Sequence, residues 1–207
     1  MKYLLLVFIA GLAVVEPHFY MREPLSRTSI QTRLDRFPQA QQPFWWDHTG
    51  VWCGNVQQNL QYSTCGRCGD AQGNSHAAQG GRYDKGIITA TYNAGQVINA
   101  VVQMHANHRG HIEFELCPQV TETNACFTHR LAVVGADRGV RGGNTACTGN
   151  DQQNGSFNIR IQLPNNVRCT RCTLRATYRT SYPPAPDACF NPNPAQTFRN
   201  CVDIRIN

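Results

Sequence analysis

Three histidines gather in one short stretch of the sequence. His105, His108 and His111 stand at three-residue spacing directly before the run Ile112–Pro118. On a helix this spacing would place the imidazoles on one face and would indicate a zinc site. The flanking residues are typical of strands, however, and in a strand residues three apart point to opposite faces. We therefore expect at most one or two of these histidines to bind one metal, and His105 and His111 to be polar-face or loop residues.

A further histidine, His18, follows a stretch typical of a secretory signal. A basic start precedes an apolar run from Leu4 to Val15, which is too short to span a bilayer. We assign residues 1–17 to this signal, with a possible short pro-dipeptide, and residues 18–207 to a single secreted domain. Because signal peptidase prefers a small residue before the cut, we expect cleavage after Val15. An X-Pro dipeptidyl aminopeptidase would then remove the remaining two residues.

Processing of this kind would give His18 a metal-binding capacity that an internal histidine lacks. Its free α-amine, with an ordinary pKa of about 8, and its imidazole would form a bidentate chelate. A third nitrogen from a distant histidine would complete a T-shaped, nitrogen-only site with open positions. Such a planar nitrogen set suits Cu(II), which also heads the affinity order of the divalent first-row metals.

The cysteines indicate an oxidising compartment. An even and high number in an exported chain predicts disulfides, here five, with a connectivity that the sequence does not define. Two Cys-x-x-Cys spacings could form a four-thiolate zinc site, but they lie far apart in the chain and further cysteines are present. We expect disulfides at all ten positions: Cys53, Cys65, Cys68, Cys117, Cys126, Cys147, Cys169, Cys172, Cys189 and Cys201.

Hydrophobic periodicity predicts an antiparallel β-sandwich. Short segments with a period of two alternate with turn residues, and a helical period is absent. The N-terminal segment 18–42 is predicted to be irregular, residues 53–82 a cysteine-stapled loop, and residues 131–153 a long glycine-rich connection. The predicted strands are 86–92, 96–102, 111–116, 157–163, 172–178 and 202–206.

Charge and composition exclude some classes of function. The net charge of +6 is spread over scattered arginines, with no basic run that would indicate nucleic-acid binding. No apolar stretch elsewhere in the chain is a candidate to cross a membrane either. Asn154-Gly-Ser156 is an acceptor sequon, as found in the loops of exported glycoproteins. We expect a secreted, extracellular monomer.

Several motifs resemble, in the same order, those of the lytic polysaccharide monooxygenases of auxiliary-activity family fifteen. Members begin with histidine and soon carry a Pro-x-Ser-Arg-x-Ser element. The resemblance covers nearly the whole chain after residue 17. Its motifs are His18 to Ser29, Trp52-Cys-Gly54, Cys65-Gly-x-Cys-Gly-Asp70, Gly80-Gly-x-Tyr83, Ala106-Asn-His-x-Gly110, Phe114-x-Leu-Cys-Pro118, Cys169-x-x-Cys172, Thr177-Tyr-Arg179 and Thr197-Phe-Arg-x-Cys-x-Asp-Ile204.

The resemblance implies an immunoglobulin-like (fibronectin-like) sandwich and a set of site residues. His18 would supply its amine and a ring nitrogen to one copper ion, and His108 the third nitrogen. Ala106 would lie beside the solvent-facing axial position. Phe198 would fill the other axial position, where many members have tyrosine, and a phenylalanine cannot bind metal. Tyr178 lies in a family motif and is assigned no catalytic role.

The resemblance also implies the reaction. With an electron donor and dioxygen or hydrogen peroxide, the copper enzyme would hydroxylate C1 or C4 of a β-1,4-linked sugar and break the chain. Insoluble chitin is the expected substrate, with cellulose as a second one. Exposed aromatic residues would contact the polymer, and Phe19 and Tyr20 are candidates. Trp45 and Trp46 are further candidates, although we expect these tryptophans in the core.

Two alternatives of other classes stay open. One is a non-catalytic polysaccharide-binding or copper-carrying protein on the same fold, which would release no oxidised sugars. The other is a zinc hydrolase built on the histidine cluster. The chain lacks a His-Glu-x-x-His motif and an obvious carboxylate for acid–base catalysis.

Overall fold

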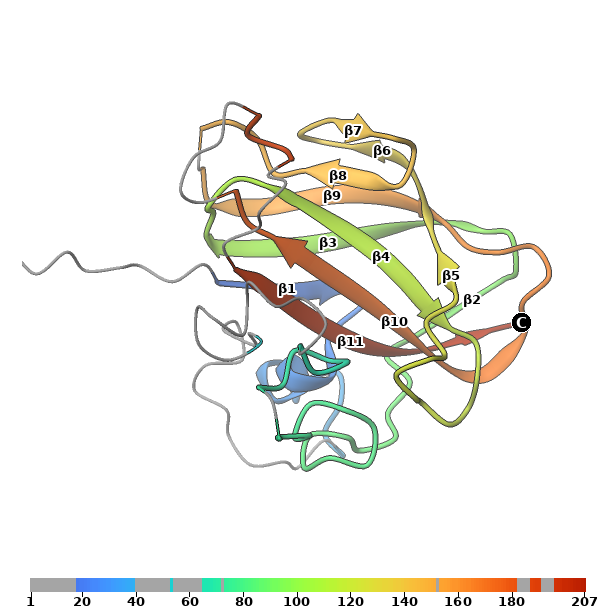
Figure 1. Cartoon of the computed structure of the whole chain (residues 1–207). Helices are drawn as coiled ribbons and strands as arrows, with labels where there is room; N and C mark the ends of the chain where they lie inside the picture. Colours follow the sequence, from blue (N-terminus) through green and yellow to red (C-terminus); the bar gives the residue numbers. More distant parts are fainter. Residues whose placement is uncertain are drawn as a thin grey trace, which may run out of the picture.

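The chain folds into two stacked β-sheets. A computed structural model describes residues 18–39, 53, 65–71, 73–151, 153–181, 187–190 and 196–207. It confirms the predicted immunoglobulin-like β-sandwich (Figure 1). Trp45 and Trp46 lie outside the described residues.

The first sheet has the order β1-β3-β9-β6 and is antiparallel throughout. The second has the order β2-β11-β10-β4-β8-β7, with β5 paired to β4. Its pairs are antiparallel except for β2 and β11, which run parallel. The strands are β1 (His18–Glu23), β2 (Ala90–Tyr92), β3 (Val97–Ala106), β4 (His111–Cys117), β5 (His129–Arg130), β6 (Ala132–Ala136), β7 (Val140–Arg141), β8 (Thr145–Cys147), β9 (Gly155–Gln162), β10 (Cys169–Arg179) and β11 (Thr197–Ile206).

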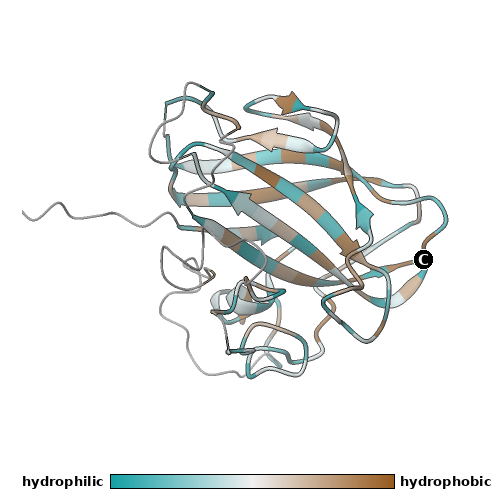
Figure 2. Ribbon diagram, viewed as in Figure 1, coloured by the Kyte–Doolittle hydropathy of each residue, from teal (hydrophilic) through white to brown (hydrophobic). Residues whose placement is uncertain are grey.

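The core forms between the sheets because apolar residues recur at every second position. Along β3 and β9 buried side chains alternate with more exposed ones, and Figure 2 shows the corresponding bands of hydrophobic and hydrophilic residues. Burial of such side chains is the main force that holds a sandwich together. The inward residues of these two strands are Ile98, Ala100, Val102, Met104, Phe157, Ile159 and Ile161.

A third layer covers part of the second sheet. Nearly every residue of β11 and all of Cys172–Tyr178 in β10 are buried, including those on the face turned away from the core. The covering layer consists of the 3₁₀ helix η1 (Arg27–Arg33) and the loop region around residues 65–85 (Figure 1). The disulfide between Cys68 and Cys201 ties this layer to β11. The outer face of these strands is therefore protein interior rather than surface.

Two segment predictions were wrong, and a third predicted strand was too long. The segment 18–42, expected to be irregular, contains β1 and η1. The connection 131–153 contains β6, β7 and β8, which are too short to show a period of two. The strand expected at 86–92 is limited to Ala90–Tyr92, where it pairs with β11.

Ten cysteines form five disulfides, as predicted. A four-thiolate zinc site is excluded because the structure contains no free cysteine. Among the described residues, no helix is long and apolar enough to cross a membrane. The pairs are Cys53–Cys65, Cys68–Cys201, Cys117–Cys126, Cys147–Cys189 and Cys169–Cys172.

Candidate metal centre

His18 lies at one end of the first sheet. It begins β1 and is the antiparallel partner of Ala106, the last residue of β3. The strand is held there because Phe19 and Met21 are fully buried in the core. His18 itself is half-buried. This pairing fixes His18 beside the turn that leads from β3 to β4 (Figure 1).

His108 lies in that turn, residues 107–110. Arg109 has a φ of 59° and Gly110 a φ of 92°. A Cβ at Gly110 would stand 2.0 Å from the carbonyl oxygen of Arg179, so only glycine fits this close approach. A backbone in such sparsely populated regions persists only where its surroundings hold it. The position of His108 therefore depends on the contacts of its neighbours.

Tyr178 of β10 holds the turn from the core side. Its hydroxyl accepts a hydrogen bond from the His108 N–H at 2.9 Å and donates one to the Arg109 carbonyl at 2.7 Å. Burial raises the pKa of Tyr178, although the bond from His108 acts in the opposite direction. The side chain is thus a neutral, fully buried hydroxyl that positions the turn carrying His108.

Asn107 holds the same turn through its side-chain amide. The Nδ2 group donates to the carbonyls of Thr148, at 2.8 Å, and Gln153, at 3.2 Å. The Oδ1 atom accepts a hydrogen bond from the Arg109 N–H at 2.9 Å. Asn107 is buried, and buried polar groups that are fully bonded make a local structure rigid.

Two neighbouring segments complete the support of the turn. The Asn107 N–H donates to Oδ1 of Asn154 at 2.8 Å. On the other side, the Ser181 N–H donates to the His108 carbonyl at 3.2 Å, and the Gly110 N–H donates to the Ala188 carbonyl at 2.7 Å. Contacts from three separate parts of the chain therefore fix the path of the backbone around His108.

The two histidines are close enough to influence each other electrostatically. Burial lowers the pKa of the half-buried His108, and the charge of His18 lowers it further. A lowered pKa favours the neutral imidazole, which is the form that binds a metal ion. The structure thus places His18 and His108 at the same end of the sandwich.

The other two clustered histidines have different surroundings. His105 is exposed on β3 and its ring stacks on Tyr20, with centroids 5.9 Å apart. His111 begins β4 and is buried, whereas a polar-face or loop position was expected. Its Nδ1 lies 2.7 Å from the Cys189 carbonyl, and its ring packs against Phe190 at 4.7 Å. Only His108 of the three lies in the turn beside His18.

The aromatic residues near the two histidines form part of the core. Phe19 and Tyr178 meet edge to face at 5.5 Å, and Tyr178 and Phe198 lie 6.1 Å apart. Phe19 and Phe198 are completely buried. The prediction that Phe19 contacts a polymer is therefore wrong, because its alternation along β1 turns it inward. Tyr20 is half-buried, and one side of it packs against a small apolar cluster.

Ala106 lies opposite His18 in the pairing of β1 and β3. It is the final residue of β3 and is only 9% exposed.

A pocket with a volume of about 590 Å³ lies on the other side of the turn. Arg141 and Asp187 form an ion pair at this pocket. The pocket is lined by Arg109, Arg141, Asn150, Asp187 and Ala188.

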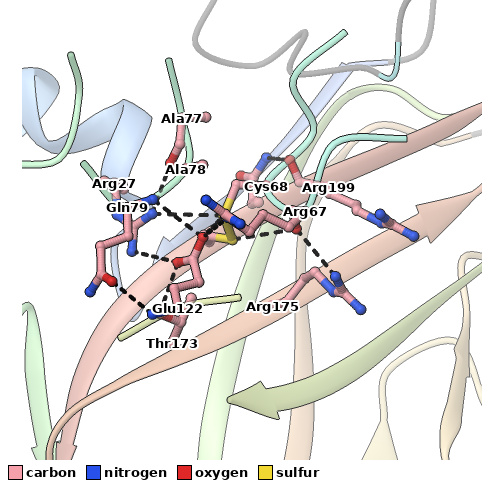
Figure 3. The surroundings of a disulfide bond; sticks show 12 residues. Arg27, Arg67, Cys68, Ala77, Ala78, Gln79, Glu122, Thr173, Arg175 and Arg199 are labelled. Carbon is pink, nitrogen blue, oxygen red and sulfur yellow. Dashed lines mark hydrogen bonds and ion pairs between the residues drawn. A yellow bond between two sulfur atoms is a disulfide. The ribbon is translucent and has the colours of Figure 1, made fainter. Parts of the chain in front are cut away.

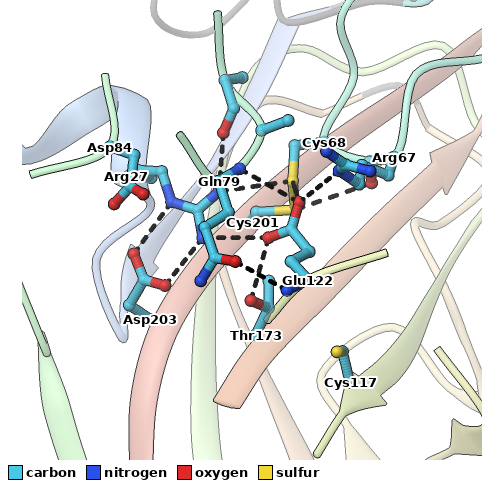
Figure 4. A network of polar contacts seen from close by, with 12 residues as sticks. Arg27, Arg67, Cys68, Gln79, Asp84, Cys117, Glu122, Thr173, Cys201 and Asp203 are labelled. Atoms are coloured by element: carbon cyan, nitrogen blue, oxygen red, sulfur yellow. Dashed lines mark hydrogen bonds and ion pairs between the residues drawn. A yellow bond between two sulfur atoms is a disulfide. The ribbon is translucent and has the colours of Figure 1, made fainter. Parts of the chain in front are cut away.

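A second cluster of ionisable residues lies between the third layer and the second sheet. Arg27 makes a bidentate pair with Asp203, at 2.9 and 2.7 Å, and a further ion pair with Glu122 at 3.1 Å (Figure 4). Burial lowers the pKa of Arg27, but the hydrogen bond and charge of Asp203 outweigh this effect and raise it above its ordinary value.

This buried charge cluster is not a metal site. Within the described residues, Cys68, Glu122 and Cys201 place potential ligand atoms within 4.8 Å of one another. The two sulfur atoms are joined in a disulfide and so offer no thiolate (Figure 3). Glu122 also receives hydrogen bonds from Arg27 and from Thr173, the latter at 3.0 Å. All of these groups serve the attachment of the third layer.

Comparison with known proteins agrees with this geometry. A family model described as lytic polysaccharide mono-oxygenase, cellulose-degrading, matches residues 18–204. The chain belongs to the lytic polysaccharide monooxygenase family. The matched region begins at His18, the first residue of β1, and ends at Ile204 within the last strand, β11. Members of this family are copper-dependent oxidative enzymes that act on polysaccharides.

A solved lytic polysaccharide monooxygenase has a closely similar structure. It is of type AA15, comes from Thermobia domestica and was determined in the Cu(I) state. The TM-score is 0.73 and the sequence identity 28%, with 91% of this chain and 98% of the other covered. No curated protein sequence matches the chain significantly. The resemblance to auxiliary-activity family fifteen is thus supported by structure as well as by sequence motifs.

Sequence reasoning missed several supports of this candidate site. It assigned no role to Tyr178 and none to Asn107, and it considered Asn154 only as a glycosylation acceptor. Tyr178 and Asn107 both lie within motifs that carry the resemblance, and this was the available signal. Their contacts with the turn depend on how β10 and the segment before β9 pack against it, which no local pattern reveals.

Proposed function

We propose that the chain is a secreted copper-dependent lytic polysaccharide monooxygenase. It cleaves β-1,4-linked polysaccharides oxidatively, with chitin as the first substrate and cellulose as the second. The observation that supports this most directly is the placement of His18, at the start of β1, beside His108 in a rigidly held turn. Family membership and the copper-containing relative point to the same activity.

The chemistry of the donors fits one copper ion per chain. His18 would bind through its imidazole and, after removal of residues 1–17, through its α-amine, and His108 through its imidazole. A nitrogen-only donor set of this kind suits copper. When bound, copper supplies the redox chemistry that activates dioxygen or hydrogen peroxide with electrons from an external donor. The start of the family match at His18 supports this processed terminus.

The surrounding residues would keep these donors in place. Tyr178 and Asn107 hold the backbone of the turn, so that the His108 imidazole does not need to be ordered when the metal binds. The small side chain of Ala106 would leave room beside the metal for the oxidant. Phe198 is buried below and has no atom that can bind a metal, so the protein would contribute nitrogen atoms only.

The substrate would dock on the end of the sandwich that carries the two histidines. Tyr20 is half-exposed beside His105 there and is the remaining aromatic candidate of the two that we named for polymer contact. The polar pocket at Arg109 and Arg141 lies beyond His108 and could accept sugar hydroxyls. We propose a single catalytic domain, residues 18–207, that acts as a monomer with a small-molecule or protein electron donor.

The test uses secreted protein whose N-terminus has been sequenced. Protein that begins at His18 is loaded with copper and incubated with ascorbate and either chitin or cellulose, and soluble products are read by mass spectrometry. We expect aldonic acids or C4-oxidised sugars from wild type and His105→Ala, and none from His108→Ala. A mature start other than His18 would contradict the copper assignment. Polymer binding without oxidised products would indicate the non-catalytic alternative.

A further inference from the structure

Asn154 lies near His18 and His108, the two residues that define the candidate metal centre. His18 faces Ala106 across β1 and β3, and Gly155 faces Met104 across β9 and β3. Asn154, which directly precedes β9, thus stands at the same end of the first sheet (Figure 1). Adjacent strands lie about 4.8 Å apart, so Asn154 is roughly two strand spacings from His18.

The side-chain amide of Asn154 has one bonded and one available end. Its Oδ1 accepts the hydrogen bond from the Asn107 N–H at 2.8 Å, one residue before His108. Its Nδ2 makes no hydrogen bond within the described part of the chain, and the residue is exposed. An N-linked glycan attaches to Nδ2 and leaves Oδ1 as an acceptor. Glycosylation is therefore compatible with the contact that supports the turn.

The third residue of the sequon also lies on the exposed face of the sheet. The hydroxyl of Ser156 donates to Oε1 of Gln103 at 2.6 Å and accepts from Nη1 of Arg22 at 3.2 Å. Ser156 is exposed. The sequon Asn154-Gly-Ser156 is thus accessible, and it is the single Asn-x-Ser/Thr sequence of the chain.

We propose that Asn154 carries an N-linked glycan that stands beside His18 and His108 and screens this end of the molecule from large partners. A glycan is bulky and strongly hydrated, and at this distance it would cover one side of the surface on which a flat polymer docks. Small reductants and dioxygen would still reach the metal. The functional meaning of this screening rests on the proposed copper site.

The experiment separates the glycan from the side chains. Wild type, Ser156→Ala and Ser156→Thr are secreted from a eukaryotic host, and wild type and Ser156→Ala are also exported from a host without N-glycosylation. Ser156→Thr keeps both the hydroxyl and the sequon. The second host shows the effect of losing the Ser156 hydroxyl alone. Intact mass gives glycan occupancy, and electron paramagnetic resonance of the Cu(II) form checks the metal site.

Two readouts measure screening. One is the amount bound to insoluble chitin and cellulose, and the other is the rate of copper reduction by ascorbate and by excess ferrocytochrome c. Glycosylated wild type and Ser156→Thr are expected to bind less polymer and to react more slowly with the cytochrome than Ser156→Ala. These three proteins from the eukaryotic host should be reduced equally fast by ascorbate. Wild type and Ser156→Ala from the host without N-glycosylation should behave alike in both readouts.

The outcomes distinguish this inference from the proposed function. An unmodified Asn154 in wild type would overturn the inference whatever the activity. If glycosylated wild type and unglycosylated Ser156→Ala bind polymer equally and are reduced by the cytochrome at equal rates, the proposed screening by the glycan is overturned. If neither of these two proteins binds chitin or cellulose but the cytochrome reduces them at different rates, the screening is supported and the proposed substrate is contradicted.

Discussion

Two regions of the molecule concentrate polar side chains, and they use them differently. In the buried charge cluster, Arg27 pairs directly with Asp203 and Glu122, and each of these charged groups is at most 1% exposed at its side chain. At the candidate metal centre, Tyr178, Asn107 and Asn154 each make a hydrogen bond to the backbone of the turn. The first region is built on ion pairs between side chains, whereas in the second region side chains position a backbone.

The difference is the one expected between a structural site and a functional one. Burying a charge costs free energy that must be offset by partners, and the cluster offsets it while attaching η1 to β11. The candidate metal centre instead presents two half-buried imidazoles beside a turn whose backbone is held by hydrogen bonds of its own. We expect substitutions in the cluster to change stability, and substitutions at the histidines to change metal binding and activity.

The largest expected effect is the loss of activity in His108→Ala. Removing one of three nitrogen donors should abolish tight copper binding and all oxidised products, because the other two remain on His18 alone. The free energy of unfolding without copper should change by less than about 1 kcal/mol, since the side chain is half-exposed. Calorimetric copper titration and chemical unfolding measure the two quantities. A large loss of unfolding free energy in His108→Ala would contradict the proposed separation between residues that stabilise the fold and residues that bind metal.

Substitution of Arg27 should give the opposite result. Arg27→Leu breaks a bidentate pair with Asp203 and an ion pair with Glu122, both buried, and leaves Arg171 and Arg67 as their remaining ion-pair partners among the described residues. Breaking buried pairs of this kind costs about 3–5 kcal/mol of unfolding free energy. The folded fraction should keep its copper affinity. Denaturant unfolding is the measurement, and Arg33→Ala is the matched control because its ion pair with Asp35 is exposed. Equal effects of the two substitutions would show that the cluster does not hold the third layer.

Tyr178→Phe should affect both properties moderately. It removes the hydroxyl between His108 and Arg109, and buried groups that lose a partner cost about 1–3 kcal/mol. Copper affinity should fall by about ten-fold or more, as for other residues that position a ligand. Tyr92→Phe, in β2, is the control, since no hydrogen bond of its hydroxyl links it to the turn. An unchanged copper affinity would contradict the positioning role of Tyr178.

The smallest effect concerns acid stability at the edge of the charge cluster. Burial alone would raise the pKa of Asp84, but bonds from the Gly80 and Gly86 N–H groups and the charges of Arg27 and Arg171 lower it. Because the folded-state pKa lies below the unfolded value of about 3.9, Asp84 stabilises the fold above that pH. This contribution is lost as the pH falls further and the carboxylate is protonated.

Asp84→Asn should therefore be less stable than wild type at neutral pH and should lose less stability on acidification. Denaturant unfolding of both proteins at neutral pH and near pH 3 measures this difference. Copper binding at neutral pH should not change. If both proteins lose the same unfolding free energy between neutral pH and about pH 3, Asp84 does not contribute to the loss of stability in acid.

Strand alternation predicted much of the sandwich, because inward residues such as Ile112 and Phe114 are buried by the opposite sheet. It did not predict β1, whose six residues lie between the signal and Pro24 and offer too short a pattern. The third layer was also beyond reach. It is attached by the Cys68–Cys201 disulfide and by Arg27, and both are contacts between distant parts of the chain.

Only part of the candidate metal centre was predicted, because its remaining contacts also join distant parts of the chain. Motif resemblance indicated His18 and His108, but the register that sets His18 opposite Ala106 depends on the packing of Phe19 and Met21. The burial of His111 follows from the Cys147–Cys189 disulfide, which brings the segment 187–190 against β4. Residues that are joined only through tertiary packing left no local signal in the sequence.

The anchoring of β1 has a consequence for how this protein must be handled. The strand is secured by residues 19–23, through their pairing with β3 and the Met21 N–H bond to Asn200 at 3.0 Å. We infer that protein with extra residues before His18 would adopt the same fold and melt at a similar temperature. Under the proposed copper chelate, purity, circular dichroism and a sharp melting curve would then not reveal a sample that cannot react. N-terminal sequencing or the mass of the first peptide would distinguish the two preparations.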